Sequence, residues 1–197
     1  MSVTCVSYAA DGWGVGEVWH DGRRLVWHEL PHPRPAAASS LGTRARARTR
    51  ARGTPSQGGG KRPPPTEATI PPKRARAGHA VRPEVQEVVH RLAAYFDGSR
   101  DDFHDVEIDT DGWTQFQLDV LRALRAVPYG EVVSYGELAR LAGYPRAQRA
   151  AGTFCAGNRF PLVVPCHRVV SASGLGAYPT LGVEYKRRML ALEGVSL

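Results

Sequence analysis

The chain has 197 residues, of which 42% are hydrophobic, and a formal net charge of +7. Its length allows one domain or two small ones, and no apolar run approaches the roughly 20 residues that a membrane-spanning helix needs. The N-terminus lacks a basic segment followed by an apolar one, so we expect no signal peptide. Its three cysteines are odd in number and far apart, which argues against a disulfide framework and predicts a reducing, cytoplasmic setting.

Residues 1–32 are predicted to form the β-meander of a small N-terminal domain. Two strand-like runs flank Asp21-Gly22, a pair that favours a two-residue hairpin loop, and Trp19 and Trp27 are expected to pack on a core face. Cys5 is followed by several histidines, but no pair among them has the spacing of structural zinc ligands, so we expect no metal site here.

Residues 33–82 differ sharply in composition from their surroundings. They hold twelve basic residues and one acidic residue, a net +11 against +7 for the chain as a whole, so the remainder carries a net −4. Their Arg/Pro/Gly-rich sequence has no hydrophobic periodicity, which predicts a disordered insert. The insert is interpreted as a solvated tether, although a polycation next to DNA also adds salt-dependent affinity. The basic net charge therefore does not indicate that the folded part binds DNA.

Residues 83–108 are predicted to complete the N-terminal domain. Pro83 suits a first helical turn, and apolar side chains recur at helical spacing from there to Phe96, where Asp97-Gly98 ends the helix. The run Phe103–Ile108 is predicted to be a short strand.

Residues 109–197 are predicted to form a mainly helical C-terminal domain. One helix carries apolar residues on one face from Phe116 to Val127. A capping box, Ser134 with Glu137, opens a short helix that ends at Gly143, and a second helix is predicted from Arg146 to Ala156. Two short helices joined by a tight turn suit a helix-turn-helix, which is either a packing unit or a DNA reader.

The run Leu162-Val163-Val164 is predicted to be a buried strand that breaks at Pro165, where Cys166 and His167 follow. Gly157-Asn158 ends the preceding helix, and both residues tolerate left-handed backbone. Cys166 is either an inert buried thiol or a nucleophile next to an imidazole. A final helix is predicted over Val183–Leu192. The fold class is therefore α/β (α+β), with a helix-turn-helix and a buried cysteine segment.

From about Leu92 to Gly194 the chain resembles the O6-alkylguanine-DNA alkyltransferases. The stretches FQLDVLRALRAVPYGEVVSYGELARLAG, GN before FPLVVPCHRVV, and KRRMLALEG occur in family order and close to family spacing. The N-terminal meander fits the family's small, variable N-terminal domain less specifically, and the basic insert is not part of the pattern. The resemblance implies direct repair of O6-alkylguanine in duplex DNA by a protein that acts once, as a monomer, without a cofactor, a metal or a membrane.

Carried over residue by residue, the resemblance implies that Cys166 accepts the alkyl group. His167 would be its base through a bridging water, and Glu193 would orient His167. Such an arrangement fits the chemistry, because a thiol is mostly protonated at neutral pH and a carboxylate on the far imidazole nitrogen fixes the tautomer. Tyr135 would donate to the guanine ring as negative charge develops there.

The resemblance also implies a DNA surface and a base pocket. Arg149 would fill the place of the flipped base, and the rest of its helix would lie in the minor groove. The other DNA-binding residues implied are Arg146, Ala147, Ala150 and Gly152. The pocket and hinge residues implied are Asn158, Pro161, Val169 and Tyr178. Two departures from the family pattern concern the pocket rim: Arg159 stands where proline is common, and the segment 174–178 is one residue short of some members.

Three other functions compete with alkyl transfer. A non-catalytic alkyltransferase-like binder of damaged DNA would lack the acceptor thiol, whereas Cys166 is present. A methylation-responsive transcriptional activator carries a cysteine-rich metal domain, which three scattered cysteines cannot form. A Cys-His hydrolase of another fold would need an oxyanion loop, and nothing in the sequence resembles one. Cys155 is expected to be a packed, inert thiol.

Overall fold

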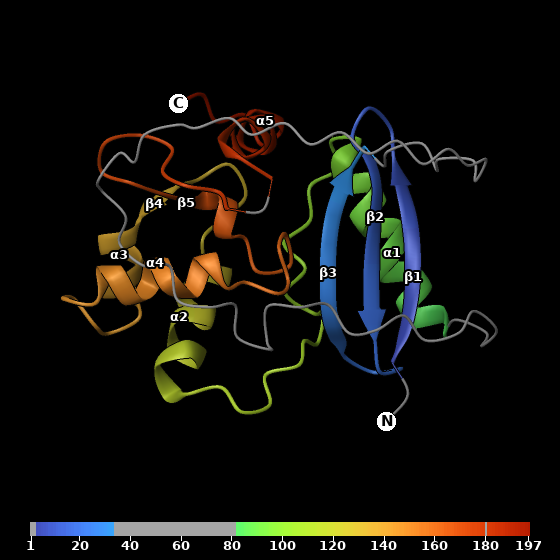
Figure 1. Ribbon diagram of the computed structural model, residues 1–197, viewed down its shortest axis with the longest axis horizontal. Coiled ribbons are helices and arrows are strands. Elements are labelled where there is room, and N and C mark those ends of the chain that lie inside the picture. The colour runs from blue at the N-terminus through green and yellow to red at the C-terminus, as the bar shows by residue number, and fades with distance from the viewer. Residues whose placement is uncertain (1–2, 34–81, 180) are drawn as a thin grey trace, which may run out of the picture.

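The computed structural model describes residues 3–33, 82–179 and 181–197. It has the expected mixed α/β class, with a small antiparallel sheet followed by a mainly helical part (Figure 1). The disorder predicted for residues 33–82 falls on a segment that lies almost wholly outside the described residues. No helix within the described ranges is long and apolar enough to cross a membrane. The elements are β1 (Thr4–Ala10), β2 (Gly14–His20), β3 (Leu25–His32), α1 (Pro83–Phe96), α2 (Gln115–Arg125), β4 (Val133–Ser134), α3 (Tyr135–Leu141), α4 (Gln148–Ala156), β5 (Val169–Val170) and α5 (Val183–Leu192).

The predicted N-terminal meander is confirmed as a three-stranded antiparallel sheet in the order β1-β2-β3. Its second loop is four residues long, Asp21–Arg24, instead of the predicted two. The Asp21 carboxylate accepts the backbone N–H groups of Arg23 and Arg24 at 2.9 and 2.7 Å, so the side chain closes a wider turn than the dipeptide predicted. Trp19 is buried as expected, whereas its cross-strand partner Trp27 is only half-buried.

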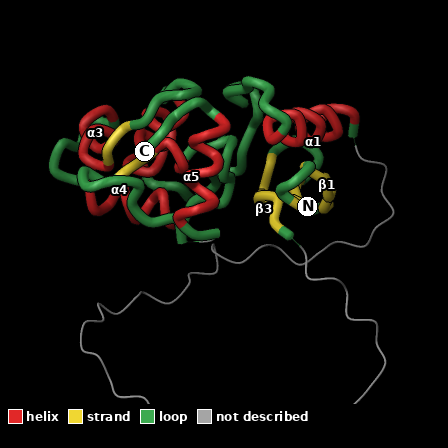
Figure 2. The backbone as a smooth tube through the Cα atoms, turned by 90° about the horizontal axis from the view of Figure 1, so that it is seen from above, coloured by secondary structure: helices red, strands yellow, loops and turns green. Residues whose placement is uncertain are grey.

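Helix α1 confirms the predicted Pro83–Phe96 helix and packs next to β1 (Figure 2). The strand predicted for Phe103–Ile108 is wrong. This segment forms a turn, Phe103 has a left-handed φ of 52°, and the segment's one ladder contact is the isolated bridge from Ile108 to Leu25. The guanidinium of Arg125 donates to the carbonyls of Phe103 and Val106, so those carbonyls are not available to a strand partner.

Helix α3 has the predicted capping box: the Ser134 hydroxyl accepts the Glu137 N–H, and the Glu137 carboxylate accepts the Ser134 N–H. Helix α4 begins at Gln148, two residues later than predicted, because the Ala147 N–H donates to the Tyr144 carbonyl in the connecting turn. At its end Gly157 has φ −95°, so the helix ends without the left-handed residue that the Gly-Asn pair predicted. α3 packs directly against α4.

The cysteine segment differs most from the prediction. Leu162-Val163-Val164 is a turn, with Leu162 at φ 77°, and the strand comes only after the cysteine, at β5. Residues Cys166–Arg168, which connect that turn to β5, form one turn of 3-10 helix. The Val164 N–H donates to the Phe160 carbonyl at 2.8 Å, which pairs the run with its own chain. β5 then pairs in parallel with β4, which places the cysteine directly beside the start of α3.

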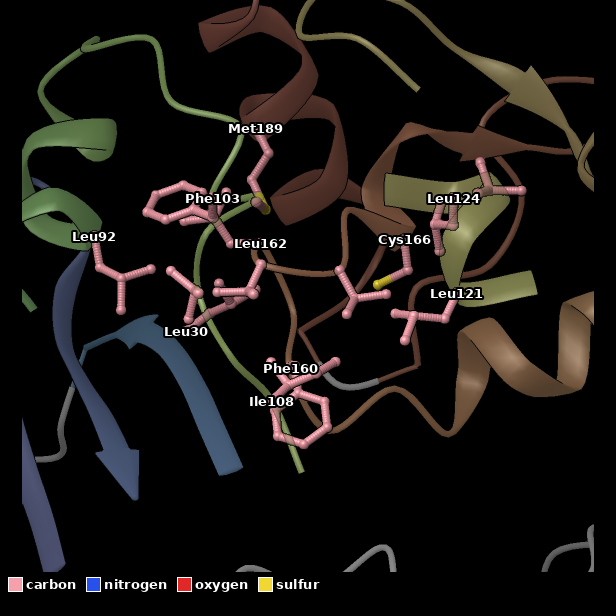
Figure 3. Packing of buried hydrophobic residues seen from close by; sticks show 14 of the residues in the cluster. Leu30, Leu92, Phe103, Ile108, Leu121, Leu124, Phe160, Leu162, Cys166 and Met189 are labelled. Carbon is pink, nitrogen blue, oxygen red and sulfur yellow. The ribbon is translucent and has the colours of Figure 1, made fainter. Parts of the chain in front are cut away.

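One hydrophobic cluster joins the two parts of the molecule. The sheet and α1 lie at one end and α3, α4 and α5 at the other (Figure 2). Leu30 and Leu92 from the N-terminal part belong to the same cluster as Leu162 and Met189 from the C-terminal part (Figure 3). The predicted division of the chain at residues 32, 82 and 108 stays a prediction.

Candidate active site

Cys166 lies in the 3-10 turn with 7% of its surface exposed. The Asn158 side chain holds this turn from the end of α4. Its Oδ1 accepts the Phe160 N–H at 2.9 Å, and its Nδ2 donates to the Val164 carbonyl at 2.8 Å and to Sγ of Cys166 at 3.1 Å. Asn158 therefore braces the hinge that its position in the sequence predicted, and it also contacts the thiol directly.

Burial is the dominant influence on the Cys166 thiol and raises its pKa. The Asn158 amide and the buried ammonium of Lys186 act in the opposite direction, because both favour the thiolate. The thiol therefore rests in its protonated form at neutral pH, and a reaction at Sγ needs a base. Disulfide formation does not mask Cys166.

His167 is fully buried and points to Glu193 at the end of α5. Its Nε2 lies 2.9 Å from Glu193 Oε1, while Nδ1 has no hydrogen-bond partner among the residues described. Burial lowers the pKa of His167, although the contact with Glu193 opposes this, so the ring is neutral at pH 7. With Nε2–H donating to the carboxylate, the lone pair lies on Nδ1, and this is the tautomer that a base at Nδ1 requires.

Glu193 is the centre of a buried polar network that the sequence did not reveal. The Arg168 guanidinium donates from Nε and Nη2 to the carboxylate at 2.8–3.2 Å and from Nη1 to the Val127 carbonyl at 2.8 Å. The Tyr95 hydroxyl donates at 2.5 Å and the Gly130 N–H at 3.1 Å. Burial alone raises the pKa of Glu193, but the hydrogen bonds from His167 and Arg168 outweigh it and hold that pKa well below its usual range. The carboxylate is therefore charged and held in one position.

Lys186 on α5 is a second buried cation without a predicted role. Its side chain is completely buried, and Nζ donates to the carbonyls of Val169 and Leu175, both at 2.5 Å. It makes no ion pair with any residue that the structure describes. Burial lowers the pKa of Lys186, while Cys166 and Cys155 act against that shift. Lys186 thus ties the strand after the cysteine to the loop that carries Ala177 and Tyr178.

A cavity of about 570 Å³ opens at Cys166, within the roughly 300–1,000 Å³ range of ligand pockets. It brings together three of the four predicted pocket and hinge residues, Asn158, Pro161 and Tyr178, with Tyr135 from the predicted catalytic set and Gly152 from the predicted DNA-binding set. Val169 does not line it, because that residue is buried in β5 behind the cysteine. Sequence reasoning missed the remaining wall, which comes from β3 through Trp27 and His28, and it missed Cys155 as a wall residue.

Tyr135 begins α3 at the cavity wall and is half-buried. Burial, followed by the nearby Cys155 and Cys166, raises the pKa of Tyr135, so the hydroxyl stays protonated and can donate. Gly152 on α4 faces this ring: a Cβ there would lie 3.8 Å from Tyr135 Cδ1. The small residue allows α4 to approach the tyrosine closely.

The outer face of α4 and the turn before it carry four of the five predicted DNA-binding residues, whereas the fifth, Gly152, lies on the cavity side of the helix. Arg146, Arg149 and Ala150 are exposed, whereas Ala147 is half-buried and packs against the core. Arg149 makes no side-chain hydrogen bond or ion pair with another described residue. Arg149 and Ala150 of α4, with Arg146 in the turn before it, thus form an exposed surface, and the other side of this helix lines the cavity. No group of three or more His, Cys, Asp or Glu side chains within the described ranges is arranged to hold a metal ion.

Three comparisons relate this chain to known proteins. Residues 115–195 match the family described as 6-O-methylguanine DNA methyltransferase, DNA binding domain. The methylated-DNA–protein-cysteine methyltransferase of Mycolicibacterium paratuberculosis is 47% identical over 105 residues, which are 53% of this chain and 62% of that relative. The protein of the same name from Methanopyrus kandleri is 41% identical over 133 residues, 66% of this chain and 91% of that relative. The crystal structure of Mycobacterium tuberculosis OGT in complex with DNA is similar with a TM-score of 0.64 and 29% identity, covering 97% of this chain and 93% of that one.

Proposed function

The chain belongs to the methylated-DNA–protein-cysteine methyltransferase family, and we propose that it repairs DNA by transferring the alkyl group of O6-alkylguanine to its own Cys166. The observation that carries this proposal is the position of Cys166 Sγ. It lies in the wall of a cavity of suitable size, hydrogen-bonded to Asn158, next to a buried His167–Glu193 pair. A thiol, a base and a fixed carboxylate are the groups that an irreversible alkyl acceptor needs.

The chemistry follows from the protonation states. His167 takes the thiol proton at Nδ1 through a bridging water, and Glu193 stabilises the imidazolium that forms. The sulfur attacks the carbon attached to O6; the S–C bond forms as the C–O6 bond breaks, and the electron pair moves to guanine. Tyr135 donates its hydrogen bond to the guanine ring where that charge develops. The thiol, the imidazole and the alkylated base balance this step, so no cofactor is part of the proposal.

The O6 atom of a paired guanine lies inside the duplex, so the base must leave the stack before it reaches Cys166. The exposed Arg149 would fill the vacated place, with Arg146 on the phosphate backbone. Ala150 and Gly152 would let α4 enter the minor groove closely. The walls at Pro161 and Tyr178 would hold the flipped base. We propose that one protein molecule acts alone, in the cytoplasm, and that residues 109–197 carry the transfer while residues 1–32 and 83–108 form the companion domain.

The product is a thioether, which no group in this mechanism reverses, so each molecule acts once. The test is to incubate the protein with duplex DNA that contains O6-methylguanine and to weigh the peptide that holds Cys166. We expect one added methyl group on that peptide, and none when Cys166→Ala is used in its place, although Cys166→Ala should bind the same DNA. A bound duplex with an unmodified Cys166 would contradict transfer and would indicate a non-catalytic binder of damaged DNA.

A further inference from the structure

One wall of the cavity belongs to the N-terminal sheet. Trp27 and His28 of β3 line the same cavity as Cys166, although more than 130 residues of chain separate His28 from the cysteine. The strand does not merely lie near the site. The backbone N–H of His28 donates to the Arg159 carbonyl at 2.9 Å, which ties β3 to the segment between α4 and the cysteine turn.

The His28 side chain makes a second link to the same segment. Its Nδ1 lies 2.7 Å from the Pro161 carbonyl, and its Nε2 lies 2.7 Å from the Tyr8 hydroxyl on β1. A carbonyl can only accept, so Nδ1 carries the hydrogen and Nε2 accepts from Tyr8. His28 is 2% exposed, and burial lowers its pKa to about 4 despite the contact with Pro161, so the ring is neutral and keeps this tautomer at pH 7.

The segment that His28 holds is strained and sits at the reacting thiol. Pro161 precedes Leu162, whose φ of 77° is a left-handed conformation that is unfavourable for a residue with a β-carbon. Such a conformation persists only where its surroundings determine it. Asn158, on the other side of Pro161, holds the thiol. A shift of the Pro161 carbonyl would therefore move both the pocket wall and the Asn158 contact to Sγ.

The same segment is anchored on its opposite side by the residue that departs from the family pattern. The Arg159 guanidinium donates to the Asp109 carbonyl at 3.1 Å and lies over the rings of Trp113 and Phe160, 5.8 and 5.2 Å from their centroids. The wall segment is thus fixed to the backbone at Asp109 by the Arg159 side chain and to the N-terminal sheet by His28.

We propose that His28 is a positioning residue for alkyl transfer. Through its hydrogen bond to the Pro161 carbonyl, the N-terminal sheet holds the wall of the base pocket and the cysteine hinge in the reactive arrangement. This inference rests on the proposed function of the cavity. It assigns to the N-terminal sheet a direct part in the site, beyond its part in the shared hydrophobic core.

The test compares the wild type with three variants at buried histidines of the N-terminal sheet. His28→Phe removes both side-chain hydrogen bonds, and His28→Asn keeps an N–H donor at the place of Nδ1. His20→Phe is the matched control, because His20 is a buried histidine of the same sheet that does not line the cavity, and its Nδ1 accepts the Gly22 N–H in the loop after β2. Single-turnover transfer from duplex DNA containing O6-methylguanine gives the maximal rate and the half-saturating protein concentration. The reaction of Cys166 with iodoacetamide measures the thiol itself.

We expect His28→Phe to lower the maximal transfer rate by about 10- to 100-fold, as a small misplacement of a reacting group does. The half-saturating concentration should change by less than about threefold, and the iodoacetamide rate should fall by much less than the transfer rate, because His28 acts mainly on where Sγ lies relative to the bound base. His28→Asn should recover most of the lost rate, and His20→Phe should transfer at nearly the wild-type rate.

Two results would overturn the role of His28. One is a His28→Phe protein that transfers as fast as His20→Phe. The other is a loss of transfer that is matched by an equal loss of iodoacetamide reactivity and of folded protein in circular dichroism, because that pattern indicates stability alone. A wild-type protein that never alkylates Cys166 would instead refute the proposed function, and the role of His28 with it.

Discussion

Arg168 offers the sharpest test of how this site is held together. Arg168 is 2% exposed. Two basic side chains among the described residues contact Glu193, and Arg168 is the charged one, because His167 is neutral at pH 7. Arg168→Met keeps an apolar stem of similar length and removes the charge and its N–H donors. The buried carboxylate would keep only Tyr95, His167 and Gly130 as partners.

Breaking one side of a buried ion pair costs about 3–5 kcal/mol, because the remaining charge stays desolvated. We expect Arg168→Met to lower the free energy of unfolding by an amount near the lower end of that range, since three other donors still bond to Glu193. Such a loss is a large share of the roughly 5–15 kcal/mol that holds a typical domain folded. Urea unfolding followed by circular dichroism at pH 7 measures it, provided that the m-values of variant and wild type agree.

The exposed pair Arg122–Asp119 provides the matched control. Its N–O distance is 2.6 Å, shorter than those of the buried pair, but the Arg122 side chain is 67% exposed. Exposed pairs contribute about 0–1 kcal/mol, so Arg122→Met should change the free energy of unfolding by less than about 1 kcal/mol. If the two arginine variants lose similar amounts, or if Arg168→Met loses less than about 1 kcal/mol, the assignment of Arg168 as the partner that stabilises Glu193 would be wrong.

The pH dependence of stability gives a second readout for Arg168. A carboxyl whose pKa is lowered in the folded protein stabilises it above the unfolded pKa of about 4.3 and loses that contribution as the pH falls through the folded pKa. Glu193 is such a group. Without the guanidinium its folded pKa rises, so Arg168→Met should lose stability at a higher pH than wild type does. Superimposable acid-unfolding curves, after correction for the offset at pH 7, would count against this reasoning.

Three further predictions concern the transfer reaction. Tyr135→Phe should slow transfer in single-turnover assays by about 10²–10³-fold, the cost of removing one preorganised donor. Tyr144 is the control, because its hydroxyl donates to Asp119, and Tyr144→Phe should leave the rate within about threefold of wild type. Arg149→Ala should slow repair of duplex DNA without changing the reaction of Cys166 with iodoacetamide, and an unchanged duplex rate would remove Arg149 from the mechanism. Deleting residues 36–80 should leave transfer intact and weaken the dependence of DNA-binding affinity on salt concentration. An unchanged slope of log affinity against log salt would show that the insert does not contact DNA.

The helices were predictable because their signals are local. Pro83 at a first turn, the apolar spacing up to Phe96 and the reciprocal caps of Ser134 and Glu137 depend only on residues within a few positions of one another. The valine-rich run before Cys166 misled the same reasoning. Its composition suits a strand, but its backbone is turned back by Leu162 and held by Asn158, and within the described residues its only bridge is the isolated one from Val164 back to Pro161.

The chemistry of the site was also accessible from the sequence. The PCHRV core, the capped SYGELA helix and the closing LEG indicated Cys166, His167 and Glu193 together, and the structure brings His167 and Glu193 into contact. Their partners were not accessible in this way. Tyr95 and Glu193 are 98 residues apart, and Arg168 follows a buried run in which an arginine would ordinarily be expected at the surface.

The sequence by itself therefore determined which thiol and neighbouring imidazole are the candidates for acceptor and base, and the helices that frame them, because residue type and short spacing are enough to specify these. Only the tertiary structure decided which charges are buried together, that Lys186 holds two carbonyls behind the cysteine, and that His28 of the N-terminal sheet reaches the pocket wall. The physical reason is that burial and hydrogen-bond pairing depend on which distant segments meet, and a carboxylate or an imidazole is stable in the interior only when a partner from elsewhere in the chain arrives there.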